Sequence, residues 1–516
     1  MALTSLTQVP AMLRPATTFM IVLVSALAHP VLATQGTVAP AKVSTELTDP
    51  IQQAVDKLQA VPGAYPAVSA VIVQGNAAPW IHIRGRLKAD QAAEADADTL
   101  FYMASQTKSF MGLLGAVLDR KGVLPLDTTL SGIWPQLRLP APADPHRITM
   151  ADLLSHQEGL TTDTLNNVTA YVRDIPAAEY PHWLETETGT RDPGFRYANL
   201  GDLIYGAALE TRTGRNWHDW LDAEVLQPLR LDHGITSRPS RMSPGRFAWN
   251  HQWDGKAWHA LAPKPDALMH AAGGLFASGK AMATWMQANL GSAGAGGALD
   301  PSDFARAQQS VAVAHMSDGQ INCDGYSLGW YSCSYKGQQA LMHPGSYVGT
   351  VSVTVLVPSA HAGLALVVNS DSAMEGFELE VMKAFIGLAT GQDGEAARLD
   401  AVVAAFPSRL AKTVDKRARA MAGSRADPSW GGWSWTPGKE ELEACSGTFR
   451  NALFGPMIVG TASGEVTADI GARHLVLKPA RPGLFAATDG TLEPAEPVTC
   501  HPDDGTIEWR HRVFRR

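Results

Sequence analysis

Apolar residues recur along the chain with two different spacings. In residues 51–60 and 110–118 they lie three or four positions apart, which is the period of an amphipathic helix. Residues 67–73 and 350–357 are instead short valine-rich runs with Gly or Pro nearby on either side, which is typical of buried strands. Residues 50–392 therefore predict one large domain that mixes helices with strands.

The pattern changes after that domain. Residues 393–441 combine a charged helical stretch with a segment rich in Trp, Pro and Gly, which indicates a helical connector and a linker. Residues 442–516 carry short apolar or alternating runs every eight to twelve residues, broken by Gly and Pro. This spacing predicts a small antiparallel β-barrel domain.

The N-terminal residues predict a secretory signal. Arg14 precedes an apolar run, residues 19–28, and Val31-Leu32-Ala33 follows with small residues at the positions typical of a cleavage site. We interpret residues 1–33 as a signal peptide and 34–49 as a flexible segment, so we expect an exported protein, periplasmic or secreted. The alternative is an amphipathic or buried N-terminal helix. No later stretch approaches the roughly 20 apolar residues that a bilayer requires, so no membrane span is predicted.

Composition narrows the possible partners. The chain is 45% hydrophobic and carries a net charge of −8 from 42 basic and 50 acidic residues. It has no lysine- or arginine-dense block that could follow a phosphate backbone, so we expect no nucleic-acid partner. The sequence does not indicate an oligomeric state.

The cysteines fit an oxidising compartment. There are 4 of them, at positions 323, 333, 445 and 500. We expect a disulfide between Cys445 and Cys500, whereas Cys323 and Cys333 can pair only if the chain between them folds back. None has zinc-type spacing, and we predict neither a metal site nor a cofactor.

Ser105-Gln106-Thr107-Lys108 is the first candidate for catalysis. On a helix, residues three apart share a face, so the Lys108 amine can lie beside the Ser105 hydroxyl as its proton acceptor. A serine in the first helical turn can also offer its own backbone N–H to an oxyanion, because the first N–H groups of a helix have no internal partner. The alternative is an ordinary helix start.

Two further polar groupings follow. Tyr197 and Asn199 lie at a loop-to-helix junction, where the phenol could act as a base only beside a positive charge such as Lys108. His343-Pro344-Gly345-Ser346 lies among strand-like runs, and the Ser346 N–H is a candidate second oxyanion donor. The alternatives are a packed tyrosine and an asparagine turn cap.

Two other histidines are not expected to take part in catalysis. His156 ends a short helix, and we expect it to fix a turn rather than act as a base. A second His-x-Gly, at 361–363, lies in a turn between strands.

In order, Ser105-x-x-Lys108, Tyr197-x-Asn199 and His343-x-Gly345 resemble the three-motif signature of the penicillin-recognising serine hydrolases. The closest branch contains class C β-lactamases, D-aminopeptidases, alkaline D-peptidases and related esterases. The resemblance covers most of residues 50–390 and implies an α+β fold, with an antiparallel sheet flanked by helices and an all-helical part. The segment after Trp433 resembles the lipocalin-like domains appended to some of these peptidases.

The resemblance also implies roles. Ser105 would attack the substrate carbonyl and form an acyl-enzyme, while Lys108 and Tyr197 would share the proton transfers. Asn199 would bind the substrate and the Lys108 side chain. The backbone N–H groups of Ser105 and Ser346 would form the oxyanion hole.

The third motif departs from the β-lactamase pattern. His343 replaces a lysine, with Gly345 and Ser346 completing the predicted substrate-binding segment. An unperturbed histidine is mostly neutral at pH 7, which weakens recognition of a substrate carboxylate and resembles the peptidase and esterase members.

The predicted function is hydrolysis of amide or ester bonds in a small molecule or short peptide. Within the resemblance we favour a peptidase acting on short or D-residue peptides. A carboxylesterase and a β-lactamase are the alternatives of the same class. A penicillin-binding or sensor protein that acylates without turnover is the alternative of another class.

Overall fold

The two valine-rich runs form strands β1 and β14 of one 8-stranded sheet, whose strand order is β10-β11-β12-β13-β14-β15-β1-β2. The computed structural model describes residues 41–192, 194–295, 297–372, 374, 376–462 and 465–516. Every neighbouring pair in this sheet is antiparallel, and Val68 lies opposite Val368 where the N-terminal hairpin joins the later strands. The strands are β1 (Ala67–Gln74), β2 (Trp80–Gly85), β10 (Ala312–Ser317), β11 (Ile321–Tyr326), β12 (Tyr331–Tyr335), β13 (Gln338–Tyr347), β14 (Thr350–Val357) and β15 (Ala362–Val368).

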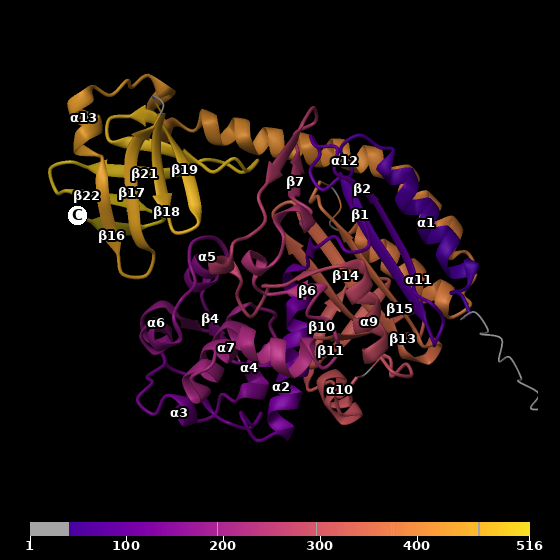
Figure 1. Ribbon diagram of the computed structural model, residues 1–516. Helices are drawn as coiled ribbons and strands as arrows, with labels where there is room; N and C mark the ends of the chain where they lie inside the picture. Colours follow the sequence, from indigo (N-terminus) through magenta and orange to yellow (C-terminus); the bar gives the residue numbers. More distant parts are fainter. Residues whose placement is uncertain (1–40, 193, 296, 373, 375, 463–464) are drawn as a thin grey trace, which may run out of the picture. The chain divides into compact units, whose positions relative to one another are not determined.

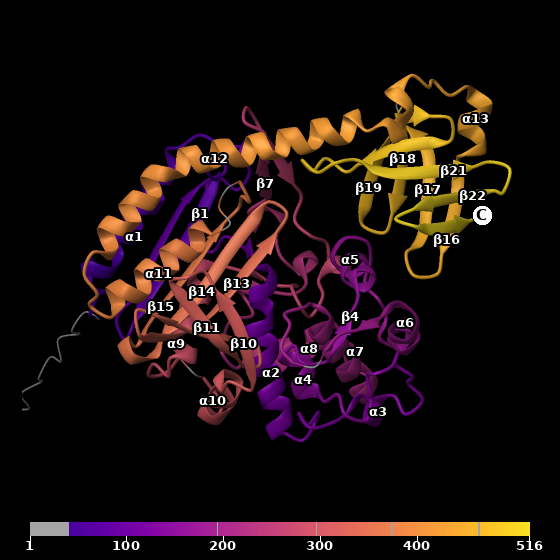
Figure 2. The same cartoon turned by 180° about the vertical axis from the view of Figure 1, so that it is seen from behind.

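Helices cover both faces of the sheet (Figures 1 and 2). One face packs against α1 (Thr45–Gln59), α11 (Phe377–Ala389) and α12 (Glu395–Ala426). The other face packs against α9 (Gly279–Asn289). The central strands β14 and β15 are buried along their whole length, so their continuous apolar runs reflect cover on both faces.

Helix α2 (Thr107–Arg120) lies between the sheet and an all-helical part (Figure 1). Its small residues permit this close packing, because a Cβ at Gly112 would lie 1.2 Å from the Leu328 carbonyl oxygen. The all-helical part consists of α3 (Leu130–Ile133), α4 (Met150–Leu154), α5 (Asp163–Tyr171), α6 (Tyr180–Glu187), α7 (Leu200–Thr213) and α8 (Trp217–Leu221). The predicted α+β architecture is therefore confirmed.

A closed barrel follows the connector. Its strands are antiparallel neighbours from β16 to β23, as the short alternating runs predict. They are β16 (Gly447–Asn451), β17 (Gly455–Ala462), β18 (Glu465–Ile470), β19 (Arg473–Arg481), β20 (Leu484–Thr488), β21 (Glu496–His501), β22 (Thr506–Trp509) and β23 (Arg512–Arg515).

Both disulfides form. Cys445 and Cys500 pair as predicted. Cys323 and Cys333 also pair, because the β11–β12 hairpin folds back and places the two residues directly opposite each other. The chain between Cys323 and Cys333 thus folds back, as their pairing requires.

The predicted end of the flexible segment, at residue 49, is wrong. The predicted signal, 1–33, lies outside the described residues, but the flexible segment expected over 34–49 overlaps α1, which begins at Thr45. Ser44 caps that helix by accepting a hydrogen bond from the Glu46 N–H, and Leu47 is buried, which fixes its first turn. No helix in the described part of the chain has the length and apolar character of a bilayer span.

Candidate active site

The nucleophile candidate lies in a tight turn at the start of α2. Ser105 is the middle residue of a 3₁₀ turn, Ala104–Gln106, that runs directly into the helix. Ala104 has a φ of 49°, a left-handed conformation that is uncommon for a residue with a Cβ and that clusters at functional sites. The first hydrogen bond of the turn runs from the Gln106 N–H to the Met103 carbonyl, so the Ser105 N–H precedes all helical pairing.

Lys108 meets Ser105 as the three-residue spacing predicts. Its Nζ lies 3.2 Å from Ser105 Oγ, 2.8 Å from Asn199 Oδ1 and 2.7 Å from the Ala272 carbonyl oxygen. A neutral amine has two N–H donors and one lone pair. With Asn199 and Ala272 accepting both donors, the lone pair of a neutral Lys108 is left to accept the Ser105 hydroxyl proton.

Burial makes that neutral form accessible. Lys108 is only 1% exposed and makes no ion pair within the described chain. Desolvation lowers the pKa of Lys108 to about 8, and the negative charge of Asp202 opposes this shift. Burial in turn raises the pKa of Asp202 to about 7. A lysine with a pKa near neutrality can serve as a general base.

The second motif lies at the start of α7. Asn199 occupies the N-cap position, yet its side chain does not cap the helix and instead accepts the hydrogen bond from Lys108. The Lys108 Nζ lies 4.9 Å from the centre of the Tyr197 ring. Tyr197 is 37% exposed as a whole residue, yet desolvation of its hydroxyl raises the pKa of Tyr197, while a hydrogen bond with the Ser105 side chain opposes that shift. The phenol is therefore protonated at neutral pH, so Tyr197 is placed to relay a proton rather than to act as a phenolate.

The third motif lies on β13, and its residues take different positions. Gly345 packs against the nucleophile turn, since a Cβ there would lie 2.3 Å from the Met103 carbonyl oxygen. Ser346, the next residue, is exposed and lines the same cavity as Ser105. The two residues predicted to supply the oxyanion donors thus line one cavity.

His343 lies behind the wall of that cavity, not in it. The residue is fully buried, and its Nε2 lies 3.1 Å from the Tyr326 hydroxyl. That hydroxyl also lies 3.1 Å from Nε2 of His156, so hydrogen bonds connect the side chains of His343, Tyr326 and His156 behind the cavity wall. Burial lowers the pKa of His343 to about 3, which keeps it neutral. The structure thus encloses both His343 and Gly345, and their predicted direct contact with substrate stays a prediction.

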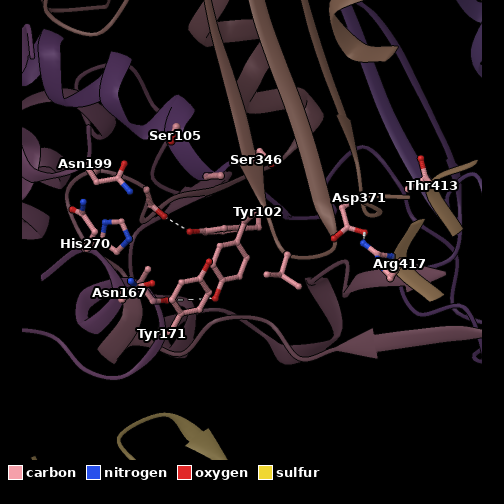
Figure 3. Close-up of a pocket in the computed structure, with 17 residues that line it drawn as sticks. Tyr102, Ser105, Asn167, Tyr171, Asn199, His270, Ser346, Asp371, Thr413 and Arg417 are labelled. Atoms are coloured by element: carbon pink, nitrogen blue, oxygen red, sulfur yellow. Dashed lines mark hydrogen bonds and ion pairs between the residues drawn. The ribbon is translucent and has the colours of Figure 1, made fainter. Parts of the chain in front are cut away.

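A cavity of about 500 Å³ opens beside Ser105 (Figure 3). Tyrosines form one wall, with the Tyr102 and Tyr347 rings 5.3 Å apart and the Tyr347 and Tyr171 rings 5.4 Å apart. The Tyr102 hydroxyl donates to the Gly273 carbonyl, which fixes the wall to the turn after His270.

In the described residues, no group of three or more His, Cys, Asp or Glu side chains could hold a metal ion.

Comparison with known proteins identifies the family of this chain. The family model described as "Beta-lactamase" matches residues 51–387, more than half of the chain. The chain belongs to the beta-lactamase family of serine hydrolases. The resemblance drawn from the three motifs is therefore confirmed.

Curated members of the beta-lactamase family are distant in sequence. Protein flp of Staphylococcus aureus (strain N315) is 22% identical over 338 residues, which cover 64% of this chain and 65% of that protein. Unguisins hydrolase ungD' of Aspergillus campestris is 25% identical over 300 residues, covering 53% of each. The chain spans less than two thirds of the length of these relatives.

Solved structures share the fold. D-amino acid amidase from Ochrobactrum anthropi SV3 superposes with a TM-score of 0.56 at 19% identity, covering 67% of this chain and 99% of the amidase chain. The octameric penicillin-binding protein homologue from Pyrococcus abyssi superposes with a TM-score of 0.54 at 15% identity, covering 91% and 99%.

Sequence reasoning missed several cavity residues of this beta-lactamase-family chain. Tyr102 stands three residues before Ser105, beside a segment that the sequence analysis singled out, whereas His270 precedes a glycine turn that it did not name. Asp371 and Arg417 also line the cavity, but no local signal marks them.

Proposed function

We propose that this protein hydrolyses amide bonds of short peptides, including peptides of D-residues, through an acyl-enzyme on Ser105. The observation that carries the proposal is the buried Lys108 amine, 3.2 Å from Ser105 Oγ and without a carboxylate partner in the described chain. A serine hydroxyl is unreactive at its free pKa, and an adjacent base activates it.

The proposed reaction uses the groups around Ser105 in the following way. Neutral Lys108 accepts the Ser105 proton while Oγ bonds to the carbonyl carbon, and the N–H groups of Ser105 and Ser346 stabilise the resulting oxyanion. The C–N bond then breaks, and the leaving nitrogen receives that proton through the Tyr197 hydroxyl. A water molecule attacks the acyl-enzyme and returns a proton to Ser105, so the net reaction consumes one water and yields one acid and one amine.

Several observations support a peptide substrate over a β-lactam. His343 is neutral and enclosed, so the third motif offers no positive charge to a β-lactam carboxylate. The cavity is wide and walled by aromatic rings, which suits an extended peptide with bulky side chains. A D-amino acid amidase is among the proteins that share this fold, which supports the same choice.

We also propose that the protein is exported. Two disulfides form, and such bonds persist in oxidising compartments. The signal-like segment at residues 1–33 supports the same location.

One panel of substrates tests the proposed activity. It contains D- and L-aminoacyl anilides, a short-chain nitrophenyl ester and a chromogenic cephalosporin, each assayed with the wild type and with a folded Ser105→Ala variant. We expect anilide hydrolysis that disappears in Ser105→Ala. Activity that survives this substitution would reject the nucleophile, and turnover of the ester or cephalosporin without the anilides would reject the peptidase assignment. Acylation without turnover would indicate the sensor alternative.

A further inference from the structure

The end of the cavity away from Ser105 carries a charged pair (Figure 3). Asp371 and Arg417 lie on the side of the cavity opposite Ser105, with Thr413 beside them. Thr413 and Arg417 are four residues apart on α12, so they share one face of that helix. This helix lies beyond residues 51–387, the part that the family model matches.

Asp371 is held by fixed donors. Its Oδ2 accepts hydrogen bonds from Gln252 Nε2 and from the Gly349 N–H, both at 3.0 Å. Gly349 has a φ of +77°, and its turn joins β13 to β14 just after Ser346. The Asp371 carboxylate therefore links the β13–β14 turn, which follows Ser346, to Arg417 on α12.

Arg417 is only partly engaged by that carboxylate. A single hydrogen bond joins Arg417 Nη2 to Asp371 Oδ1, at 3.3 Å, and it is the only polar contact of the Arg417 side chain within the described residues. A guanidinium has five N–H donors, and a carboxylate can take two of them in parallel. Because the Arg417 side chain is 19% exposed and lines the cavity, its remaining N–H groups are accessible to a ligand.

No other permanent cation faces this space. Among the described residues that line the cavity, Arg417 is the only lysine or arginine. His270 also lines it, but burial lowers the pKa of His270, so this ring stays neutral. The enclosed Lys108 is engaged by Ser105, Asn199 and Ala272.

We propose that Arg417 binds a carboxylate of the substrate, so that the preferred substrates are short peptides with a free C-terminal carboxylate. Asp371 positions the guanidinium from one edge, and the substrate carboxylate binds its other N–H groups. Thr413 lies one helical turn away on the same face as an additional hydroxyl. This inference rests on the proposed function, because it names the substrate class of the same site.

A matched pair of peptides tests the inference. The pair is an N-acetylated tripeptide of D-residues and the same tripeptide with a C-terminal amide. We expect wild-type kcat/KM to favour the acid by about tenfold or more, as befits a charged hydrogen bond. Arg417→Ala should abolish that preference through KM, Arg417→Lys should keep part of it, and hydrolysis of a neutral nitrophenyl ester should stay within about twofold of wild type. Arg419→Ala, which removes an exposed arginine from the same helix, is the matched control and should change nothing.

A binding measurement separates this inference from the proposed function. In the Ser105→Ala background, calorimetry measures binding of the tripeptide acid and of its amide without any turnover. Preference for the acid that disappears with Arg417→Ala supports the carboxylate site even if the wild type hydrolyses neither peptide. Equal binding of acid and amide, or a preference that persists in Arg417→Ala, would overturn the inference while leaving any Ser105-dependent hydrolysis intact.

Discussion

The two ends of the active-site cavity use positive charge in opposite ways. At one end Lys108 is buried, with no ion pair in the described chain, and desolvation lowers its pKa to about 8. At the other end Arg417 is partly exposed and paired with Asp371, so it keeps its charge at every physiological pH. The first cation can release its proton, whereas the second cannot.

This difference separates chemistry from binding. An amine whose pKa lies near neutrality can transfer a proton, and burial among packed residues keeps its pKa in that range. A guanidinium at an open cavity wall can only attract a negative group, and solvent and salt moderate its effect. Substitutions at the buried end should therefore lower kcat, whereas substitutions at the open end should raise KM for acidic substrates.

The largest effect is expected from Lys108→Ala. Removal of the general base should lower kcat for an activated ester by about 10³- to 10⁴-fold. Lys108→Arg is the matched control, because it keeps the positive charge but cannot lose a proton. Steady-state kinetics on variants with wild-type circular dichroism measure the effect. Full activity in Lys108→Arg would show that this end of the cavity supplies only charge, and the contrast with Arg417 would fail.

Tyr197→Phe should have the next largest effect. It keeps the ring beside Lys108 and removes only the hydroxyl that relays the proton, so we expect kcat to fall about 100-fold with KM within about threefold. Kinetics with the anilide substrate measure the two constants separately. An unchanged kcat would refute the proton relay.

Gly345→Ala tests how closely the buried end is packed. The added methyl would meet the Met103 carbonyl oxygen, so the nucleophile turn or β13 must move. We expect a loss of about 1–3 kcal/mol in the free energy of unfolding and a fall in kcat of about tenfold to 100-fold. Gly460→Ala in β17 is the control, because a Cβ there has nothing within 4 Å. Equal behaviour of the two variants would contradict the close approach.

The pH dependence should report the Lys108 amine. Lys108 acts as a base only when deprotonated, so kcat/KM should rise about tenfold per pH unit below its pKa of about 8 and level off above it. Asp202→Asn removes a negative charge that stabilises the ammonium form, so it should move this limb to lower pH. A pH profile from 5 to 10 on a neutral ester measures both limbs. A shift to higher pH in Asp202→Asn would contradict the assignment.

Added salt should produce the smallest effect. It should weaken substrate binding at the Arg417 end of the cavity and leave the Lys108 end almost unchanged. The Debye length falls from about 10 Å at 0.1 M to about 3 Å at 1 M, so added salt should reduce the preference for the tripeptide acid by a few-fold. Hydrolysis of the neutral ester should change less over the same range, since the Lys108 site is enclosed. Parallel loss of both rates would remove the distinction between the two ends.

Much of the fold could be predicted because its determinants are local. Valine-rich runs predicted strands β1 and β14 of the sheet, and short alternating runs predicted the barrel from β16 to β23. The start of α1 was missed because Ser44 caps it within a polar stretch that lacks a strong apolar period. The burial of His343 was also missed, since a motif specifies a residue but not what packs around it.

The sequence by itself predicted that Lys108 lies beside Ser105. A helical turn places residues three apart on one face, and this holds whatever surrounds the helix, so Lys108 had to lie near Ser105. Only the tertiary structure decided that this lysine is desolvated and that Arg417, more than three hundred residues later, lines the same cavity. Burial and long-range proximity depend on how the sheet, the helical part and α12 pack together, and no local pattern of residues encodes that packing.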